Sequence, residues 1–149
     1  MDSAYDLVVV GGGIAGGALA IVMARAGYSV LLLEETDAFQ DKVRGEWIAP
    51  WGVAEVQHLG LYNLLLSAGG HHLSRHTTYE ESRPPEAADA ASMPLDVFIP
   101  GVAGPLCLGH PLHCQTLFDE AGRTGATALR GVALGRLGRS GDEAAVVTL

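Results

Sequence analysis

Residues 6–34 decide the fold of this chain, and they read DLVVVGGGIAGGALAIVMARAGYSVLLLE. Residues 6–10 form an apolar, β-branched run of the kind that makes a buried parallel strand. A glycine-rich turn follows, and residues 18–26 have the small and aliphatic side chains of a helix. Residues 29–33 make a second apolar run that ends at Glu34. The stretch therefore predicts a strand, a turn, a helix and a second strand followed by an acid.

The glycines of the turn have the GxGxxG spacing, and each has a physical task. Gly11 lets the chain turn off the strand, Gly13 leaves the backbone open to a pyrophosphate, and Gly16 lets the helix pack close to the strands. The N–H groups and the positive dipole end at the helix start would hold the phosphates. Glu34, 23 positions after Gly11, would accept hydrogen bonds from both adenosine ribose hydroxyls and repel a 2′-phosphate, and no arginine follows it. The pattern predicts an unphosphorylated ADP moiety, as in FAD or NAD; the alternative is a glycine turn that binds nothing.

Composition narrows the class of protein. A chain of 149 residues with 48% hydrophobic and 17% charged residues fits one globular α/β domain. A net charge of −8 argues against nucleic acid or an anionic membrane surface as a partner. Asp2 and Asp6 stand where a secretion signal has basic residues, and the apolar run 7–23 is rich in glycine, so we expect no stable membrane insertion. Cys107 and Cys114 lack the spacing of a zinc site or a disulfide framework, which favours reduced thiols in a cytoplasmic protein.

Local patterns predict the elements that follow Glu34. Pro50 suits a helix start, and apolar residues recur behind it at helical spacing. The predicted elements are helices at 50–59 and 61–67, a strand within 71–79, a loop at 80–93, a short strand at 96–99, a helix at 110–122, a strand at 125–130, and a hairpin of 132–137 with 144–149 around a turn at 138–142.

The fingerprint, followed by Arg-Gly-Glu at 44–46 and a proline-containing helix ending in Leu-Gly-Leu at 59–61, resembles the FAD-dependent monooxygenases. These are the single-component aromatic hydroxylases and the related epoxidases and halogenases. The resemblance implies that Glu34 binds the ribose and that Arg44 lies near the flavin and its phosphates, although a solvated loop arginine is the alternative. The family usually has an arginine where His110 stands, so this position is assigned no contact. The predicted cofactor-binding residues are Gly11, Gly13, Ile14, Ala15, Gly16, Glu34, Glu35 and Arg44.

Two tryptophans and three histidines invite functional interpretations that we do not favour. Trp47 and Trp51 could shield a cofactor, but packing aromatics are commoner. His71, His72 and His76 have no Cys or carboxylate partner at a ligand spacing, so we predict no metal site and expect exposed histidines. A histidine near the flavin could still help proton transfer. No side chain is assigned as a catalytic acid or base.

The predicted fold is α/β: a Rossmann-like FAD/NAD(P)-binding fold with a parallel sheet and a β-meander. We expect residues 1–70 to form the FAD-binding segment, 71–105 to begin the substrate-side sheet, and 106–149 to return to the FAD-binding domain, incomplete at the C-terminus. In the resembled family the meander is followed by an Asp-Gly pair and then by a Gly-Asp segment that leads into a helix, and neither is found after the predicted meander here. This predicts the N-terminal portion of a longer flavoenzyme, apparently truncated, with the adenosine half of the site present.

The resemblance implies an FAD-dependent oxidoreductase, foremost a monooxygenase that hydroxylates or epoxidises a small organic substrate with O₂ and NAD(P)H. A flavin-dependent halogenase or a prenyl-type reductase of the same fold is an alternative, and so is a non-catalytic nucleotide-binding remnant. We expect the chain alone to hold flavin poorly and to self-associate through exposed strand edges, because the apolar strand at 144–149 would lack a covering layer.

Overall fold

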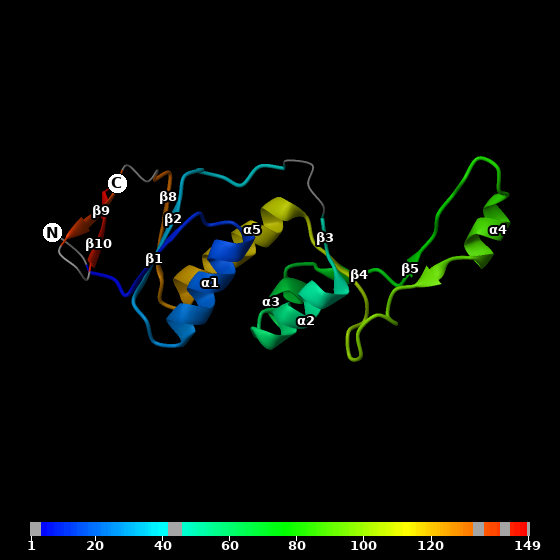
Figure 1. Cartoon of the computed structure of the whole chain (residues 1–149), viewed down its shortest axis with the longest axis horizontal. Helices are drawn as coiled ribbons and strands as arrows, with labels where there is room; N and C mark the ends of the chain where they lie inside the picture. Colours follow the sequence, from blue (N-terminus) through cyan, green and yellow to red (C-terminus); the bar gives the residue numbers. More distant parts are fainter. Residues whose placement is uncertain (1–3, 42–45, 133–135, 141–143, 149) are drawn as a thin grey trace. The chain divides into compact units, whose positions relative to one another are not determined.

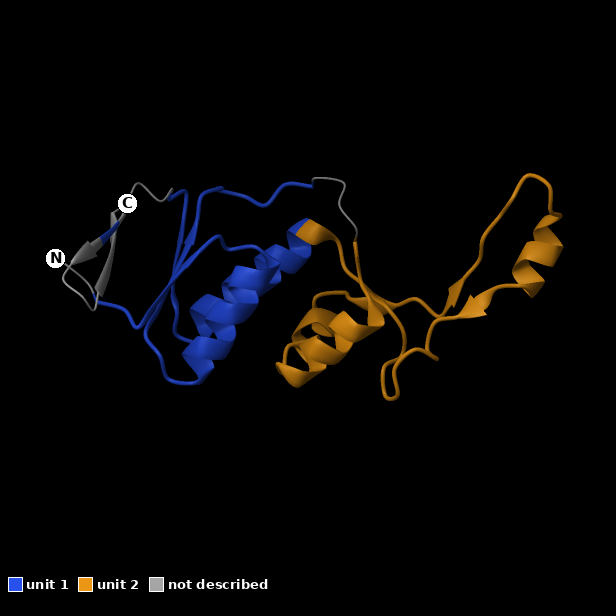
Figure 2. Ribbon diagram, viewed as in Figure 1, with its two compact units in different colours: residues 1–42, 111–149 blue, residues 43–110 orange. Residues whose placement is uncertain are grey.

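The computed structural model describes residues 4–41, 46–132, 136–140 and 144–148, and the chain divides into two compact units. Unit 1 comprises residues 1–42 and 111–149, and unit 2 comprises residues 43–110 (Figure 2). The predicted division at 70 and 105 concerned function rather than compactness, and it stays a prediction.

Unit 1 is built on a three-stranded parallel sheet in the order β1-β2-β8 (Figure 1). The strands are β1 (Leu7–Val10), β2 (Val30–Glu34) and β8 (Thr127–Arg130). The first four residues of the central strand β2 are buried, as expected of a strand covered on both faces. Its last residue, Glu34, pairs in register with Arg130 at the end of β8. The predicted parallel sheet is therefore confirmed.

Two helices of unit 1 pack against each other through a glycine. Helix α1 (Ile14–Arg25) buries Gly17, Ala20 and Ile21, and α5 (His110–Arg123) buries a row that includes Leu117 and Phe118. A Cβ atom placed on Gly17 would lie 2.8 Å from the Cβ atom of Leu117, so the contact requires a residue without a side chain. Helix α1 begins four residues earlier than predicted, because the end of the glycine turn is already helical.

A hairpin follows β8. Strands β9 (Arg136–Ser140) and β10 (Ala144–Thr148) pair antiparallel, with Ala144 opposite Ser140 and Thr148 opposite Arg136. The predicted hairpin is confirmed, but the ladder continues through residues 138–140, which we had assigned to its turn. Residues 133–135 of the predicted strand at 132–137 and residues 141–142 of the predicted turn at 138–142 lie outside the described residues.

Unit 2 combines a small antiparallel sheet with two helices. The sheet has the order β3-β7-β4, from β3 (Trp47–Ile48), β7 (Leu106–Cys107) and β4 (His71–His72). The predicted helices are present as α2 (Pro50–His58) and α3 (Tyr62–Ser67). The fully buried aliphatic side chains of this unit are Val53, Leu61, Leu65 and Leu106.

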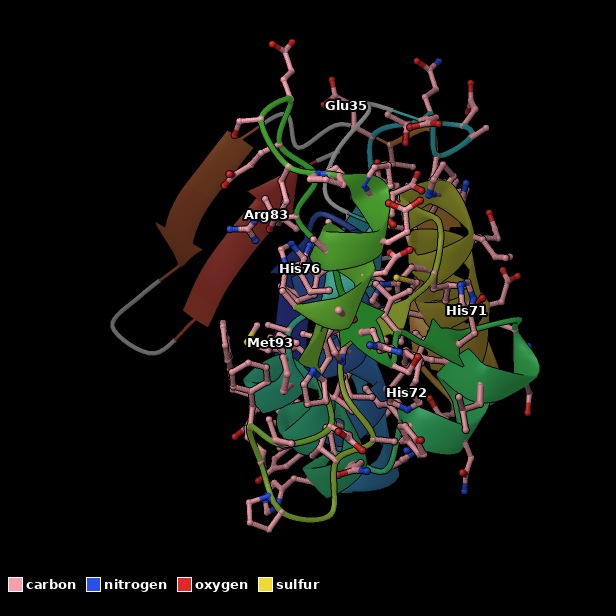
Figure 3. The ribbon with its side chains drawn as sticks, turned by 90° about the vertical axis from the view of Figure 1, so that its right-hand side faces the viewer. Glu35, His71, His72, His76, Arg83 and Met93 are labelled. Carbon is pink, nitrogen blue, oxygen red and sulfur yellow. The ribbon has the colours of Figure 1, made fainter. Side chains whose placement is uncertain are left out.

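The segment between β4 and β7 departs most from the prediction. The expected strand at 71–79 is reduced to β4 and β5 (Arg75–His76), and β5 pairs with β6 (Met93–Pro94). Figure 3 labels His76 and Met93, which are opposite each other in this pair.

Two predicted elements in that segment are wrong. The loop at 80–93 contains helix α4 (Pro85–Ala90), where a proline suited to the first helical turn precedes glutamate and alanines that favour a helix. The strand at 96–99 is absent: these residues form bends, and Val97 and Phe98 are exposed. Without a neighbouring strand to pair with, its β-branched and aromatic residues do not make a strand.

Within the part of the chain that the structure describes, we find no helix both long and apolar enough to cross a membrane.

Candidate nucleotide-binding site

The glycine turn leaves β1 through a conformation that glycine adopts easily. Gly11 has φ of 102°, in the left-handed region where other residues are strained. Its N–H donates to the carbonyl of Leu33 at 2.8 Å, which ties the start of the turn to β2. The chain can therefore leave the strand and enter α1 within a few residues.

Gly13 and Gly16 are glycines for different reasons. A Cβ atom on Gly13 would meet no atom within 4 Å, so the backbone at the helix start is open. A Cβ atom on Gly16 would lie 1.9 Å from the carbonyl oxygen of Gly11 and 3.2 Å from Cγ1 of Val9. Gly16 thus permits close packing within the protein, whereas Gly13 leaves space outside it.

The start of α1 has the features of an anion-binding helix end. Gly13 is its N-cap residue, and no side chain caps the helix. The N–H of Gly17 donates to the carbonyl of Gly13 at 2.8 Å, while Ile14 and Ala15 in the first turn are exposed. The N–H groups of a first turn have no partner within their helix and carry the positive end of its dipole.

Glu34 holds its carboxylate against the glycine turn. Oε2 accepts a hydrogen bond from the Gly12 N–H at 2.7 Å, and Oε1 accepts from the Thr36 N–H at 3.0 Å and the Thr36 hydroxyl at 2.7 Å. Partial burial is the largest single influence and raises the pKa of Glu34, but these hydrogen bonds and the Arg130 charge together hold the pKa below its usual value. A carboxylate has about four acceptor positions, so the three protein donors leave about one for a ligand hydroxyl, fewer than the two ribose hydroxyls predicted from the sequence.

Arg130 is the residue near this site that sequence analysis missed. Its Cζ atom lies 4.2 Å from the ring centroid of Phe39 and 4.5 Å from that of Phe118. Nη1 donates to the carbonyl of Asp37 at 3.0 Å, while Nη2 is buried without a hydrogen-bond partner. The residues directly after Glu34 include no arginine, whereas the parallel pairing of β2 with β8 brings one from 96 positions further along the chain.

For the two remaining predicted cofactor-binding residues, Glu35 and Arg44, the structure shows no contact with the glycine turn among the described residues. Glu35 is exposed in the loop after β2 (Figure 3), and Arg44 is outside the described residues. In unit 2, Trp47 and Trp51 are 52% and 68% exposed, so the interpretation of both as packing aromatics is wrong. Helix α2 buries Pro50 and Val53 and leaves Trp51 to solvent.

One of the three histidines is not an exposed residue. His71 and His76 are exposed on β4 and β5, but His72 is half-buried (Figure 3). Its Nδ1 lies 2.9 Å from the carbonyl oxygen of Gly104, so Nδ1 carries the proton and Nε2 accepts from the Tyr62 hydroxyl at 2.8 Å. The described residues contain no group of three or more His, Cys, Asp or Glu side chains placed to hold a metal ion.

Neither Cys107 nor Cys114 forms a disulfide in the described part of the chain. Cys114 on α5 is completely buried, and burial raises the pKa of its thiol, opposed in part by the N–H of Ile14. Burial also raises the pKa of Cys107, which is half-buried.

The sequence profile described as the FAD binding domain matches residues 4–134, and the chain belongs to this family. FAD is the cofactor that this membership assigns. Squalene epoxidase 2, mitochondrial, from Arabidopsis thaliana is 29% identical over 104 residues, which cover 70% of this chain and 17% of that protein. Menaquinone reductase from Mycolicibacterium smegmatis is 40% identical over 72 residues, covering 48% of this chain and 18% of that protein. The chain thus spans less than a fifth of the length of these relatives.

Solved structures share the fold. The p-nitrophenol 4-monooxygenase PnpA from Pseudomonas putida DLL-E4 superposes with a TM-score of 0.76 at 17% identity, covering 95% of this chain and 35% of that one. A geranylgeranyl bacteriochlorophyll reductase-like protein from Thermoplasma acidophilum superposes with a TM-score of 0.67 at 19% identity, and the match covers 92% of this chain and 32% of that one. The predicted family and the Rossmann-like FAD-binding fold are confirmed.

Proposed function

We propose that the glycine turn at 11–16 and Glu34 bind the ADP moiety of FAD, with Glu35 and Arg44 contributing at its edge. The observation that carries this proposal is the 2.7 Å hydrogen bond from the Gly12 N–H to the Glu34 carboxylate. It holds an ionised acid beside an uncapped helix start whose backbone at Gly13 is open. These features fit a ligand that has a ribose hydroxyl and a pyrophosphate.

Each part of the site has one task in this proposal. The N–H groups of the first turn of α1 orient the pyrophosphate, and Glu34 accepts a ribose hydroxyl. Gly13 lets the phosphates approach the backbone, and Gly16 keeps α1 close to β1. When bound, FAD supplies the redox chemistry, and the residues of this chain bind and orient it.

The reaction that we propose is oxygenation of a small organic substrate with O₂ and NAD(P)H, by an FAD-dependent monooxygenase to which this chain contributes the ADP-binding part. The similarities to a squalene epoxidase and to the fold of p-nitrophenol 4-monooxygenase support this class. Reduction of a prenyl-type substrate is the second candidate, because the 40% identity to a menaquinone reductase and the fold of a geranylgeranyl reductase-like protein favour it.

A competition between ADP and 2′-phospho-ADP tests the site. In isothermal titration of the full chain we expect ADP to bind more tightly, because an ionised Glu34 repels the extra phosphate. Glu34→Gln should reduce the difference between the affinities for ADP and for 2′-phospho-ADP. The matched control is Asp119→Asn, an exposed carboxylate on α5, which should leave both affinities unchanged. Equal affinity of the wild type for both nucleotides would show that Glu34 does not face the ribose.

Oxygen labelling separates the two reactions. The FAD-bound flavoenzyme to which this chain contributes is supplied with NAD(P)H, ¹⁸O₂ and a panel of aromatic and isoprenoid substrates. A monooxygenase consumes O₂ and places one labelled oxygen atom in the product. A reductase yields a saturated, unlabelled product without O₂, and that result would replace the first candidate with the second.

We also propose a cytoplasmic location and self-association of the chain. The two cysteines form no disulfide in the described residues, which suits a reducing compartment. Among the described strands, β1 and β8 are the edges of the parallel sheet, and exposed edges favour pairing between chains. Size-exclusion chromatography over a range of protein concentrations tests the second proposal, and a concentration-independent monomer would contradict it.

A further inference from the structure

Arg130, which is paired in register with Glu34 at the end of the sheet, is held there by two aromatic rings. The rings of Phe39 and Phe118 both contact its guanidinium, an arrangement that stabilises the cation through the ring faces. A buried Nη2 without a hydrogen-bond partner opposes this, because an unsatisfied buried donor is unfavourable. The favourable and unfavourable contacts of Arg130 therefore do not by themselves explain why its side chain is held in this position.

We propose that Arg130 is a positioning residue for the Glu34 carboxylate, the group that receives the ribose hydroxyl. The inference rests on the nucleotide site proposed above. The hydrogen-bond donors to Glu34 are the uncharged Gly12 and Thr36, whereas Arg130 brings a positive charge to the same end of the sheet. That charge favours the ionised carboxylate.

The two aromatic rings determine how the charge acts. In the described part of the chain, no ion pair within 4.0 Å joins Arg130 to Glu34. The clasp of Phe39 and Phe118, together with the hydrogen bond to the Asp37 carbonyl, keeps the guanidinium from forming a two-point contact with the carboxylate. Arg130 thus stabilises the charge of Glu34 without occupying the acceptor position that a ligand needs.

The same cluster reaches the glycine turn. A Cβ atom on Gly12 would lie 2.7 Å from Cδ2 of Phe118 and 3.0 Å from Cβ of Glu34. The N–H of Val132, two residues after Arg130, donates to the Glu34 carbonyl at 3.1 Å. Displacement of Arg130 would therefore disturb both the charge and the placement of Glu34.

Few other ionisable groups act on this carboxylate. The Cys114 thiol on α5 interacts with Glu34 and is protonated at neutral pH because burial raises its pKa. Glu35 and Asp37 follow in the loop after β2, and the glycine turn has no ionisable side chain. Among these ionisable groups, Arg130 is the one whose charge lowers the pKa of Glu34, and it adds to the larger effect of the hydrogen bonds from Thr36 and Gly12.

A double-mutant cycle on the full chain tests the inference. ADP affinity is measured by isothermal titration for the wild type, Arg130→Met, Glu34→Gln and the double variant, from about pH 4.5 to about pH 7.5. We expect Arg130→Met to weaken binding about threefold at neutral pH and to weaken it further at the acidic end, because without the Arg130 charge the Glu34 carboxylate takes up its proton at a higher pH. In the Glu34→Gln background, Arg130→Met should have no further effect. An unchanged affinity and pH profile, or an equal loss in both backgrounds, would overturn the inference.

Two further variants keep the test decisive. Arg123→Met, on the exposed side of α5, is the matched control and should bind ADP as the wild type does. If Arg130→Met fails to fold by circular dichroism, Phe39→Leu, which opens one side of the clasp and keeps the charge, enters the same cycle with the same expected dependence on Glu34. Absence of ADP binding by the wild type contradicts the proposed function itself, whereas normal wild-type binding with no dependence on Arg130 and Phe39 contradicts only this inference.

Discussion

Replacement of Gly16 by alanine tests the packing of the glycine turn without any ligand. The added Cβ atom would lie 1.9 Å from the carbonyl oxygen of Gly11 and 3.1 Å from its carbonyl carbon. Both are backbone atoms, so no side chain can rotate away, and α1 must move relative to the turn. We therefore expect Gly16→Ala to destabilise the folded chain.

The magnitude follows from two opposing effects. Overpacking of a well-packed site costs about 1–3 kcal/mol, and a contact this short with backbone belongs at the upper end. Alanine returns up to about 1 kcal/mol through its higher helix propensity. The net loss is about 2 kcal/mol, which lowers Tm by about 4–8 °C for a chain of this size.

Thermal and urea unfolding followed by circular dichroism measure the loss. The matched control is Gly122→Ala in α5, where a Cβ atom would meet no atom within 4 Å. At this position alanine adds no close contact, so only its higher helix propensity acts, and we expect stabilisation of up to about 1 kcal/mol. If Gly16→Ala were as stable as the wild type, or gained stability as Gly122→Ala does, the close approach of α1 to the turn would be wrong.

Three other predictions concern pH, thiols and unit 2. Folding lowers the pKa of Glu34, so its contribution to stability is present above the usual glutamate pKa of about 4.3 and is lost as the pH falls through the pKa of the folded state. In Glu34→Gln, the free energy of unfolding measured with urea should therefore vary less with pH in this acidic range. An unchanged slope would contradict this prediction. In Ellman's assay at neutral pH we expect Cys114 to react only on unfolding and Cys107 to react slowly, because both are partly or fully buried and their pKa values are raised; two fast native thiols would be inconsistent with the structure. Tyr62→Phe removes the donor to Nε2 of His72 and should lower the free energy of unfolding by about 1 kcal/mol, whereas no change would mean that the hydrogen bond does not form.

The nucleotide half of the fold could be predicted because its signals are local. The strand, glycine turn, helix and acid follow one another within residues 6–34, and each has a side-chain or backbone requirement visible in the sequence. The start of α1 was misplaced by four residues because glycine and alanine carry no strong signal for a helix boundary. Even so, the order of elements left few alternatives to a parallel sheet.

Contacts between positions far apart in the chain could not be predicted from the sequence. Arg130 and Glu34 meet only through the pairing of β8 with β2. In unit 2, α4 and the bends at 96–99 lie in a segment of weak periodicity, where short helices and strands depend on tertiary pairing rather than on propensity. The exposure of Trp51 likewise depends on which face of α2 is covered.

Titration of ADP into the wild-type chain and into Gly13→Val tests the central claim most directly. A Cβ atom on Gly13 would meet nothing within 4 Å, and its φ of −68° suits any residue, so the variant should fold and unfold as the wild type does. Its branched side chain would nevertheless occupy the space that the pyrophosphate needs. We predict that the wild type binds ADP and that folded Gly13→Val does not. Equal binding of ADP by the two folded proteins would contradict the assignment of the turn as the nucleotide site.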